Sequence, residues 1–269
     1  MIAIYILPHR KHNMLERTFI HVPGIGQTTE RRLWEAGVRE WQDALGLERK
    51  PLSFSEERWR LVRDTLTSSV QSLNAGDHRH FAGLLAARDH WRAFPDFQHR
   101  AAYVDIETTG CTGFDMVTVI GVYDGVRTRQ YVAGDNMDQF PADIDDFSLL
   151  VTFNGACFDL PFLRQRFPGL DFHQLHIDLR YPLASLGLKG GLKAIEKRVG
   201  LARGDAIDGM DGWDAVRLWH EYRQGREASL ELLLEYNRAD IENLAVLVRF
   251  GYERLWERLE TGPACAAGK

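Results

Sequence analysis

Cysteine is scarce in this 269-residue sequence, and its pattern excludes several classes of protein. The sequence contains Cys111, Cys157 and Cys265, widely spaced and without a Cys-x-x-Cys pair. This spacing argues against a disulfide framework and against a zinc knuckle, and it suits a reducing compartment. We therefore expect a cytoplasmic protein.

Long hydrophobic runs are also missing. The apolar stretch at residues 1–7 is too short for a membrane span or the core of a signal peptide, and it lacks a basic leader. We therefore expect no membrane partner.

A strong excess of positive charge is absent as well. The formal net charge is −5, so bulk electrostatics do not mark the whole chain as a polyanion binder. The balance is uneven, because residues 1–95 carry 14 Lys and Arg against 11 Asp and Glu. The apolar content of 45% and charged content of 26% are those of an ordinary globular protein. The length allows one large domain or two smaller ones.

The chain divides by its sequence patterns into three parts. Residues 1–98 predict a small all-helical module, residues 99–260 predict an α/β domain, and residues 261–269 predict a flexible tail. Strands are predicted at Ala101–Glu107, Met116–Tyr123, Thr128–Ala133, Ser148–Phe153 and Leu175–Leu179. Helices are predicted at Leu160–Arg166, Leu192–Val199, Trp213–Arg223 and, in more than one piece, Leu230–Leu259. A three-strand meander followed by alternating strands and helices indicates an α/β or α+β sheet with helices on both faces.

The helical module contains a glycine turn, Val22–Gly26, between residues that favour helices. We expect Thr28 or Thr29 to cap the helix that follows the turn. The stretch of about residues 18–46 resembles a helix-hairpin-helix motif. That resemblance implies that backbone amides freed by Gly24 and Gly26 hold a nucleic-acid phosphate at a helix N-terminus. Arg31 and Arg32, one turn further on, would add positive charge. The alternative is a simple turn between two packed helices.

Asp105 and Glu107 interrupt an apolar strand at positions i and i+2. Such residues point to the same face of a strand, so the two carboxylates would enter one space. Their repulsion is relieved if a divalent cation with oxygen ligands lies between them. The alternative is a pair of solvated acids at the end of a strand.

Further acids follow later in the chain. Asp159 opens the helix after the fourth predicted strand, where it could also be a plain cap. Tyr236 and Asp240 are four residues apart and so lie on one helix face, where they could also be ordinary surface residues.

Taken together, the order of these motifs resembles the DEDD 3′→5′ exonucleases of the ribonuclease H-like superfamily, tyrosine subclass. The run over residues 103–250 is most similar to the YprB-like predicted exonucleases, whose later elements match Asp178-Leu179 and Gly191–Glu196 here. The resemblance implies a ribonuclease H-like, mixed five-stranded sheet. It also implies that two Mg²⁺ or Mn²⁺ ions are held by Asp105, Glu107, Asp159 and Asp240. Tyr236 would orient the attacking water, because a free tyrosine is a poor base at neutral pH.

Other residues are candidate contacts to nucleic acid. Lys189 and Lys193 flank a glycine pair at a helix start and could hold a backbone phosphate, or could be solvated. Asn154 belongs to the second exonuclease-like motif, and Phe158 could stack a terminal base, although core packing is the stronger expectation. His173 and His176 are expected at the surface. The segment 135–147 is shorter than in the family, so the resemblance does not predict the structure of the substrate-site wall next to it.

The sequence therefore predicts a metal-dependent 3′→5′ exonuclease acting on nucleic acid, with DNA preferred over RNA as the expected partner. One alternative is a nucleic-acid-binding adaptor with a weak or inactive nuclease fold. Another is a structure-specific endonuclease that uses the same cations. Intact acids at all four positions argue against an inactive adaptor.

Overall fold

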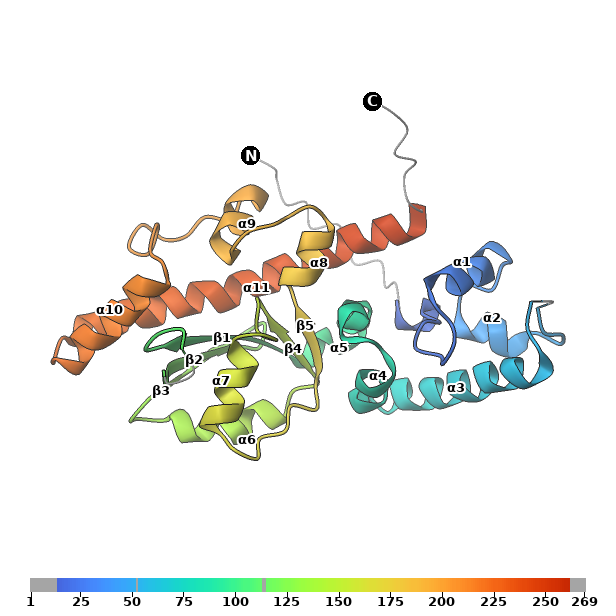
Figure 1. The fold of residues 1–269 in the computed structure, drawn as a ribbon, viewed down its shortest axis with the longest axis horizontal. Helices are drawn as coiled ribbons and strands as arrows, with labels where there is room; N and C mark the ends of the chain where they lie inside the picture. The colour runs from blue at the N-terminus through green and yellow to red at the C-terminus, as the bar shows by residue number, and fades with distance from the viewer. Residues whose placement is uncertain (1–13, 52, 113–114, 262–269) are drawn as a thin grey trace, which may run out of the picture. The chain divides into compact units, whose positions relative to one another are not determined.

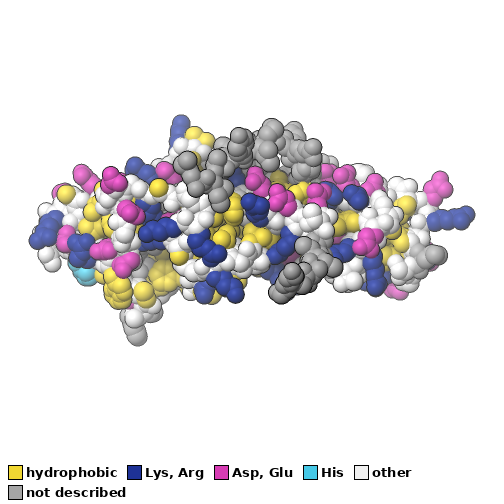
Figure 2. Space-filling view, turned by 90° about the horizontal axis from the view of Figure 1, so that it is seen from above, with side chains coloured by type: hydrophobic (Ala, Val, Ile, Leu, Met, Phe, Trp, Pro, Cys, Tyr) yellow, Lys and Arg dark blue, Asp and Glu magenta, His cyan; other side chains and the backbone are white. Residues whose placement is uncertain are grey.

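The computed structural model describes residues 14–51, 53–112 and 115–261 (Figure 1). Within these ranges the chain forms two compact units. One contains Arg100–Phe172 and the residues from Ile177 onward, and the other runs up to His99 and includes His173–His176. No helix of the described ranges is long and apolar enough to cross a membrane. Side chains of both charge signs are interspersed over the face drawn in Figure 2.

The second unit is built from short helices. They are η1 (Leu15–Arg17), α1 (Gln27–Glu35), α2 (Trp41–Gly46), α3 (Glu56–Asn74), α4 (His78–Leu84), η2 (Ala87–Ala93), α5 (Phe94–Phe97) and η3 (Gln98–Arg100). A buried ion pair joins α1 to η2, because both Glu30 oxygens lie 2.9 Å from Arg92 Nη1. Glu30 Oε1 also accepts a hydrogen bond from the Phe19 amide at 2.7 Å. The carboxylate thus ties the segment before the glycine turn to the helix after it.

The glycine turn leads directly into α1. Gly24 has φ +79°, a left-handed conformation that favours glycine, and extended Gly26 is the N-cap of α1. No side chain caps this helix, so the predicted capping by Thr28 or Thr29 is wrong. The helix begins at Gln27, so Thr28 and Thr29 both lie inside its first turn and neither is at the N-cap position. Arg58 of α3 donates a hydrogen bond to the Gly24 carbonyl, which fastens the turn to the unit.

The first unit contains a mixed five-stranded sheet, as the sequence predicted. Its strands are β1 (Ala101–Thr108), β2 (Val117–Tyr123), β3 (Thr128–Val132), β4 (Leu149–Thr152) and β5 (Leu175–Asp178), in the order β3-β2-β1-β4-β5. β2 pairs antiparallel with both β1 and β3, whereas β4 is parallel to β1. Strand β1 is therefore central.

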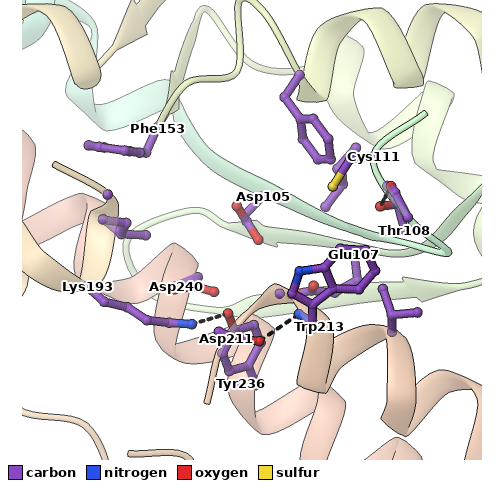
Figure 3. Close-up of a pocket in the computed structure, with 17 residues that line it drawn as sticks. Asp105, Glu107, Thr108, Cys111, Phe153, Lys193, Asp211, Trp213, Tyr236 and Asp240 are labelled. Carbon is purple, nitrogen blue, oxygen red and sulfur yellow. Dashed lines mark hydrogen bonds between the residues drawn. The ribbon is translucent and has the colours of Figure 1, made fainter. Parts of the chain in front are cut away.

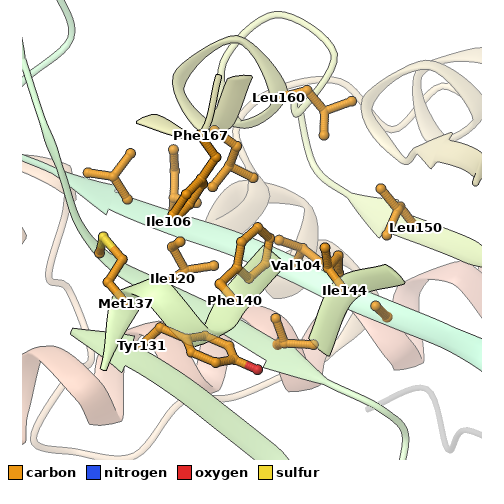
Figure 4. Close-up of a cluster of buried hydrophobic side chains, with 14 of the residues drawn as sticks. Val104, Ile106, Ile120, Tyr131, Met137, Phe140, Ile144, Leu150, Leu160 and Phe167 are labelled. Carbon is orange, nitrogen blue, oxygen red and sulfur yellow. The ribbon is translucent and has the colours of Figure 1, made fainter. Parts of the chain in front are cut away.

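Helices cover both faces of this sheet (Figure 1). They are η4 (Met137–Gln139), α6 (Phe140–Asp145), α7 (Asp159–Arg166), α8 (Arg180–Ser185), α9 (Leu192–Val199), α10 (Gly212–Arg223) and α11 (Glu227–Thr261). On one face, Phe140 of α6 and Leu160 of α7 belong to one buried cluster with Ile106 and Ile120 (Figure 4). The short α6 thus supplies core residues although its segment is abbreviated. On the other face, Val119 packs with side chains of α10 and α11.

Helix α11 is a single helix of 35 residues, so the prediction of more than one piece is wrong. The helix contains Gly251, a residue that weakens helices. A Cβ atom at Gly251 would lie 3.2 Å from Leu183 Cδ2, so the glycine permits close packing against α8 instead of ending the helix.

Strand β2 and helix α11 approach very closely at Gly121. A Cβ atom at Gly121 would lie 2.1 Å from Asn237 Oδ1. Asn237 is fully buried, and its Nδ2 donates to the Asp105 carbonyl at 3.3 Å. Its Oδ1 accepts from Gln130 Nε2 at 3.1 Å. These contacts fix the position of α11 over β1, and with it the residues on either side of Asn237.

Replacing Gly121 with Ala should therefore destabilise the unit by about 1–3 kcal/mol, because the added methyl overpacks the space that Asn237 fills. Urea denaturation followed by circular dichroism measures this change. Gly212→Ala is the matched control, since nothing lies within 4 Å of its added Cβ. Equal stability of the two variants would contradict the close approach.

Candidate metal centre

Asp105 and Glu107 of β1 face the α10–α11 side of the sheet. The residues that alternate with them, Val104 and Ile106, belong to the core on the opposite face. In the antiparallel pairing, Asp105 lies opposite Gly121 and Glu107 opposite Val119. Glu107 is buried and Asp105 is partly buried, so neither is a freely solvated acid.

Helix α11 adds a third carboxylate. Asp240 is buried one turn after Tyr236, on the face that packs over β1. One carboxylate oxygen from each of Asp105, Glu107 and Asp240 lies within 4.8 Å of the others. Residues separated by more than 130 positions in the sequence are thus brought into one small space, shown in Figure 3.

Asp159 is buried at the first turn of α7. It lies outside the group of three carboxylates that share the 4.8 Å distance. Its charge still acts on the group, since it contributes to raising the pKa of Asp105. Burial, partly offset by nearby backbone hydrogen bonds, raises the pKa of Asp159 itself to about 7. The structure therefore assembles three of the four predicted acids closely and places the fourth beside them.

The carboxylates strongly oppose one another's ionisation. Loss of solvent raises the pKa of Asp105 and Glu107 well above the ordinary range, and the charge of Asp240 raises both further. Within the described ranges, Glu107 Oε1 and Asp159 Oδ1 are buried without a hydrogen-bond partner. Buried carboxylate oxygens that lack donors are the ligand type that Mg²⁺ and Mn²⁺ prefer. The residues therefore fit a divalent cation.

Lys193 of α9 holds Tyr236 and lines the same pocket as the acids. Lys193 Nζ donates to the Tyr236 hydroxyl and to the Met210 carbonyl, and lies 4.3 Å from the centre of the tyrosine ring. Burial and the charge of Asp240 raise the pKa of Tyr236, which keeps the hydroxyl protonated at neutral pH. Lys189, by contrast, is exposed and does not line the pocket.

The three acids open into a pocket of about 460 Å³. Phe153, Phe158 and Trp213 contribute aromatic walls. Phe158 also packs on Phe162, with ring centroids 4.9 Å apart, and so serves the core as well as the pocket. Trp213 is 72% exposed, although its backbone is fixed by the Asp211 cap at 2.8 Å. Sequence reasoning placed Trp213 at a helix start without assigning it a site role.

Asn154 lies beside this pocket but does not line it. Its φ of +66° is unusual for a residue other than glycine. Asp178 holds the turn by accepting from the amides of Asn154 at 2.7 Å and Ala156 at 3.1 Å. The side-chain oxygen of Asn154 accepts from Arg180. The structure thus gives Asn154 a part in shaping the turn that leads to Asp159.

In the helical unit, Gly24, Gly26, Arg31 and Arg32 are all exposed. His173 and His176, predicted at the surface, belong to the same unit and are partly buried. His173 Nδ1 lies 2.9 Å from His78 Nε2, and the His176 amide donates to His90 Nδ1 at 3.0 Å. Packing against other histidines, which the sequence spacing does not reveal, accounts for their burial.

Sequence reasoning also missed Arg203, which follows α9 in an irregular segment. Its guanidinium contacts Glu196 and Asp240. Because Arg203 lies outside any helix or strand, no periodic pattern in the sequence indicates which acids it contacts.

A model of the RNase H superfamily, RNase_H_2, matches residues 102–250, more than half of the chain. This chain therefore belongs to the RNase H superfamily. The structure of the family B DNA polymerase from the hyperthermophilic archaeon Pyrobaculum calidifontis is similar over 58% of this chain, with 16% identity and a TM-score of 0.44. The match covers 24% of the polymerase chain. A comparison with curated proteins finds no match.

Binding of Mn²⁺ should release protons at pH 6.5. The metal-free carboxyl groups retain protons because their pKa values are raised, to about 7 for Asp159, whereas cation ligands must be ionised. Apparent affinity should accordingly rise as the pH increases through about 7. Calorimetric titration in two buffers of different ionisation enthalpy measures the proton release.

Asp159→Asn should release fewer protons than the wild type, and Asp208→Asn, at an exposed position, should release as many. Identical heats in both buffers would contradict the raised pKa values.

Proposed function

We propose that this chain is a metal-dependent 3′→5′ exonuclease that hydrolyses phosphodiester bonds in nucleic acid. The observation that carries the proposal is the convergence of Asp105, Glu107 and Asp240 within 4.8 Å on an RNase H superfamily fold. Asp159, buried beside them, would complete the ligand set for two Mg²⁺ or Mn²⁺ ions. Asp105, Glu107 and Asp240 all line one pocket, and Glu107 Oε1 has no hydrogen-bond partner there, so this acidic group is suited to binding cations and not to binding phosphate directly.

Cations bound at these carboxylates would activate water and stabilise charge on the leaving oxygen. The protein's own groups would orient the reactants. Tyr236 keeps its proton, so its hydroxyl is suited to positioning the attacking water and not to removing a proton from it. Lys193 donates a hydrogen bond to that hydroxyl and also lines the pocket, where its positive charge can contact a phosphate.

The aromatic residues of the pocket offer surfaces for the bases of a single strand. Nucleobases stack on aromatic side chains regardless of sequence. Phe158 is partly committed to the core, whereas the exposed ring of Trp213 is available at the pocket edge. We assign base stacking to Trp213 with Phe158 as a supporting wall.

The helical unit would hold the nucleic-acid backbone. Gly24 and Gly26 leave the start of α1 open, and Arg31 and Arg32 project from its first turns into solvent. Amides at a helix N-terminus together with arginine side chains favour a phosphate. Lys189, exposed before α9, and Asn154 remain secondary candidates for strand contacts.

The activity itself is tested with 3′- and 5′-labelled single-stranded DNA and RNA in Mn²⁺ or Mg²⁺. We expect stepwise shortening from the 3′ end by the wild type. Asp105→Asn should reduce the rate to that seen without divalent cation, because it removes a ligand charge while conserving side-chain shape. Asp208→Asn is the control and should retain full activity. Equal rates for wild type and Asp105→Asn would contradict the proposal, and cleavage of a circular strand would indicate an endonuclease.

The backbone contact is tested with Arg31→Ala/Arg32→Ala. If both arginines neutralise phosphates, the slope of log affinity against log salt for single-stranded DNA should decrease by about 1.4, or about 0.7 per contact. Fluorescence anisotropy over a salt series measures this slope. Arg60→Ala/Arg79→Ala removes two exposed charges from α3 and α4 and should leave the slope unchanged. An unchanged slope in the hairpin variant would contradict the assignment.

A further inference from the structure

The clearest unexplained feature near the acids is a buried chain of charged groups behind Asp240. Glu196 of α9, Arg203 and Asp240 have side chains that are 2%, 5% and 7% exposed. Arg203 forms a bidentate pair with Glu196, in which Nε and Nη2 each donate to a carboxylate oxygen at 2.8 Å. Its Nη2 also donates to Asp240 Oδ1.

We infer that Arg203, held by Glu196, is a positioning residue that fixes the Asp240 carboxylate for cation binding. This inference rests on the metal centre of the proposed function. The contact engages Oδ1 of Asp240 through a donor whose own direction is set by the planar fork to Glu196. A carboxylate restrained at one oxygen can rotate less, so its other oxygen is presented in a defined direction.

The net charge of Arg203 and Glu196 together explains why Arg203 does not take the place of a divalent cation at Asp240. A lone arginine against Asp240 would neutralise it and weaken its attraction for a divalent ion. Glu196 balances the Arg203 charge through two hydrogen bonds, so the pair is close to neutral and provides direction without cancelling Asp240.

The packing around Glu196 supports the same role. Asn243 of α11, three residues after Asp240, donates to Glu196 Oε1 at 3.0 Å. Glu196 is therefore held both by Arg203 and by the helix that carries Asp240. The guanidinium carbon of Arg203 also lies 5.6 Å from the centre of the Tyr236 ring, so Arg203 contacts both predicted site residues of α11.

The positioning role and a role in charge balance alone predict opposite changes in Mn²⁺ affinity for the variant Arg203→Gln. Removing a positive charge with Arg203→Gln would tighten Mn²⁺ binding if Arg203 were only a competing cation. If Arg203 positions Asp240, the same variant should weaken binding by roughly 10-fold or more, the usual effect of losing a group that orients a metal ligand. Arg203→Lys keeps the charge but cannot reproduce the planar fork, so it should also weaken binding.

The experiment measures Mn²⁺ dissociation constants by calorimetry for wild type, Arg203→Gln, Arg203→Lys and Glu196→Gln, without nucleic acid. Arg217→Gln is the matched control, because Arg217 is an exposed residue of α10 that contacts two acids of the same helix and does not line the pocket. Thermal melting without metal separates folding from binding, and the comparison uses the variants that melt cooperatively. Weaker binding in the Arg203 and Glu196 variants, with Arg217→Gln at the wild-type value, supports the inference. Unchanged or tighter binding in Arg203→Gln overturns it.

Hydrolysis is measured separately on the same proteins. The positioning role predicts a lower kcat with unchanged KM for the nucleic acid, and partial recovery at high Mn²⁺. If the wild type binds Mn²⁺ but hydrolyses no nucleic acid, the proposed function fails while the affinities still support Arg203 positioning. If the wild type does not bind Mn²⁺, the metal centre and the inference both fail.

Discussion

Mutual repulsion among buried carboxylates is the constraint on which the rest of this structure depends. Asp105, Glu107 and Asp240 are held within 4.8 Å in a place where water cannot fully screen them. Burial and neighbouring charge both raise the pKa values of these groups, so the metal-free arrangement retains protons. The fold must therefore hold the acids in place by contacts that oppose this repulsion.

Two sets of contacts provide that support. On the strand side, Gly121 lets α11 approach β2 closely enough for Asn237 to reach the Asp105 backbone. On the helix side, the nearly neutral Glu196 and Arg203 pair holds Asp240 from behind. The first contact sets the distance between strand and helix, and the second sets the direction of a carboxylate. The acidic group therefore depends on residues outside the group of three carboxylates, namely Gly121, Asn237 and the Glu196 and Arg203 pair.

The sequence predicted what depends on local periodicity. Alternation along β1 predicted that Asp105 and Glu107 share a face, because side chains alternate over a repeat of two. Apolar runs predicted the five strands, and the family resemblance implied that they form one mixed sheet. Contacts between residues far apart in the chain could not be predicted from these local patterns. Arg203 lies in an irregular segment, and its choice of Asp240 depends on how α11 packs. The prediction that Leu230–Leu259 forms more than one helix was wrong, and the sequence does not show the close contact that Gly251 makes with Leu183.

The central claim is that these carboxylates bind a pair of divalent cations, and anomalous diffraction from crystals grown with Mn²⁺ tests it most directly. The account predicts two manganese peaks about 3.5–4 Å apart. They should be bounded by oxygens of Asp105, Glu107 and Asp240, with Asp159 contributing to one of them. Absence of manganese from these carboxylates at a saturating concentration, with the fold intact, would contradict the account.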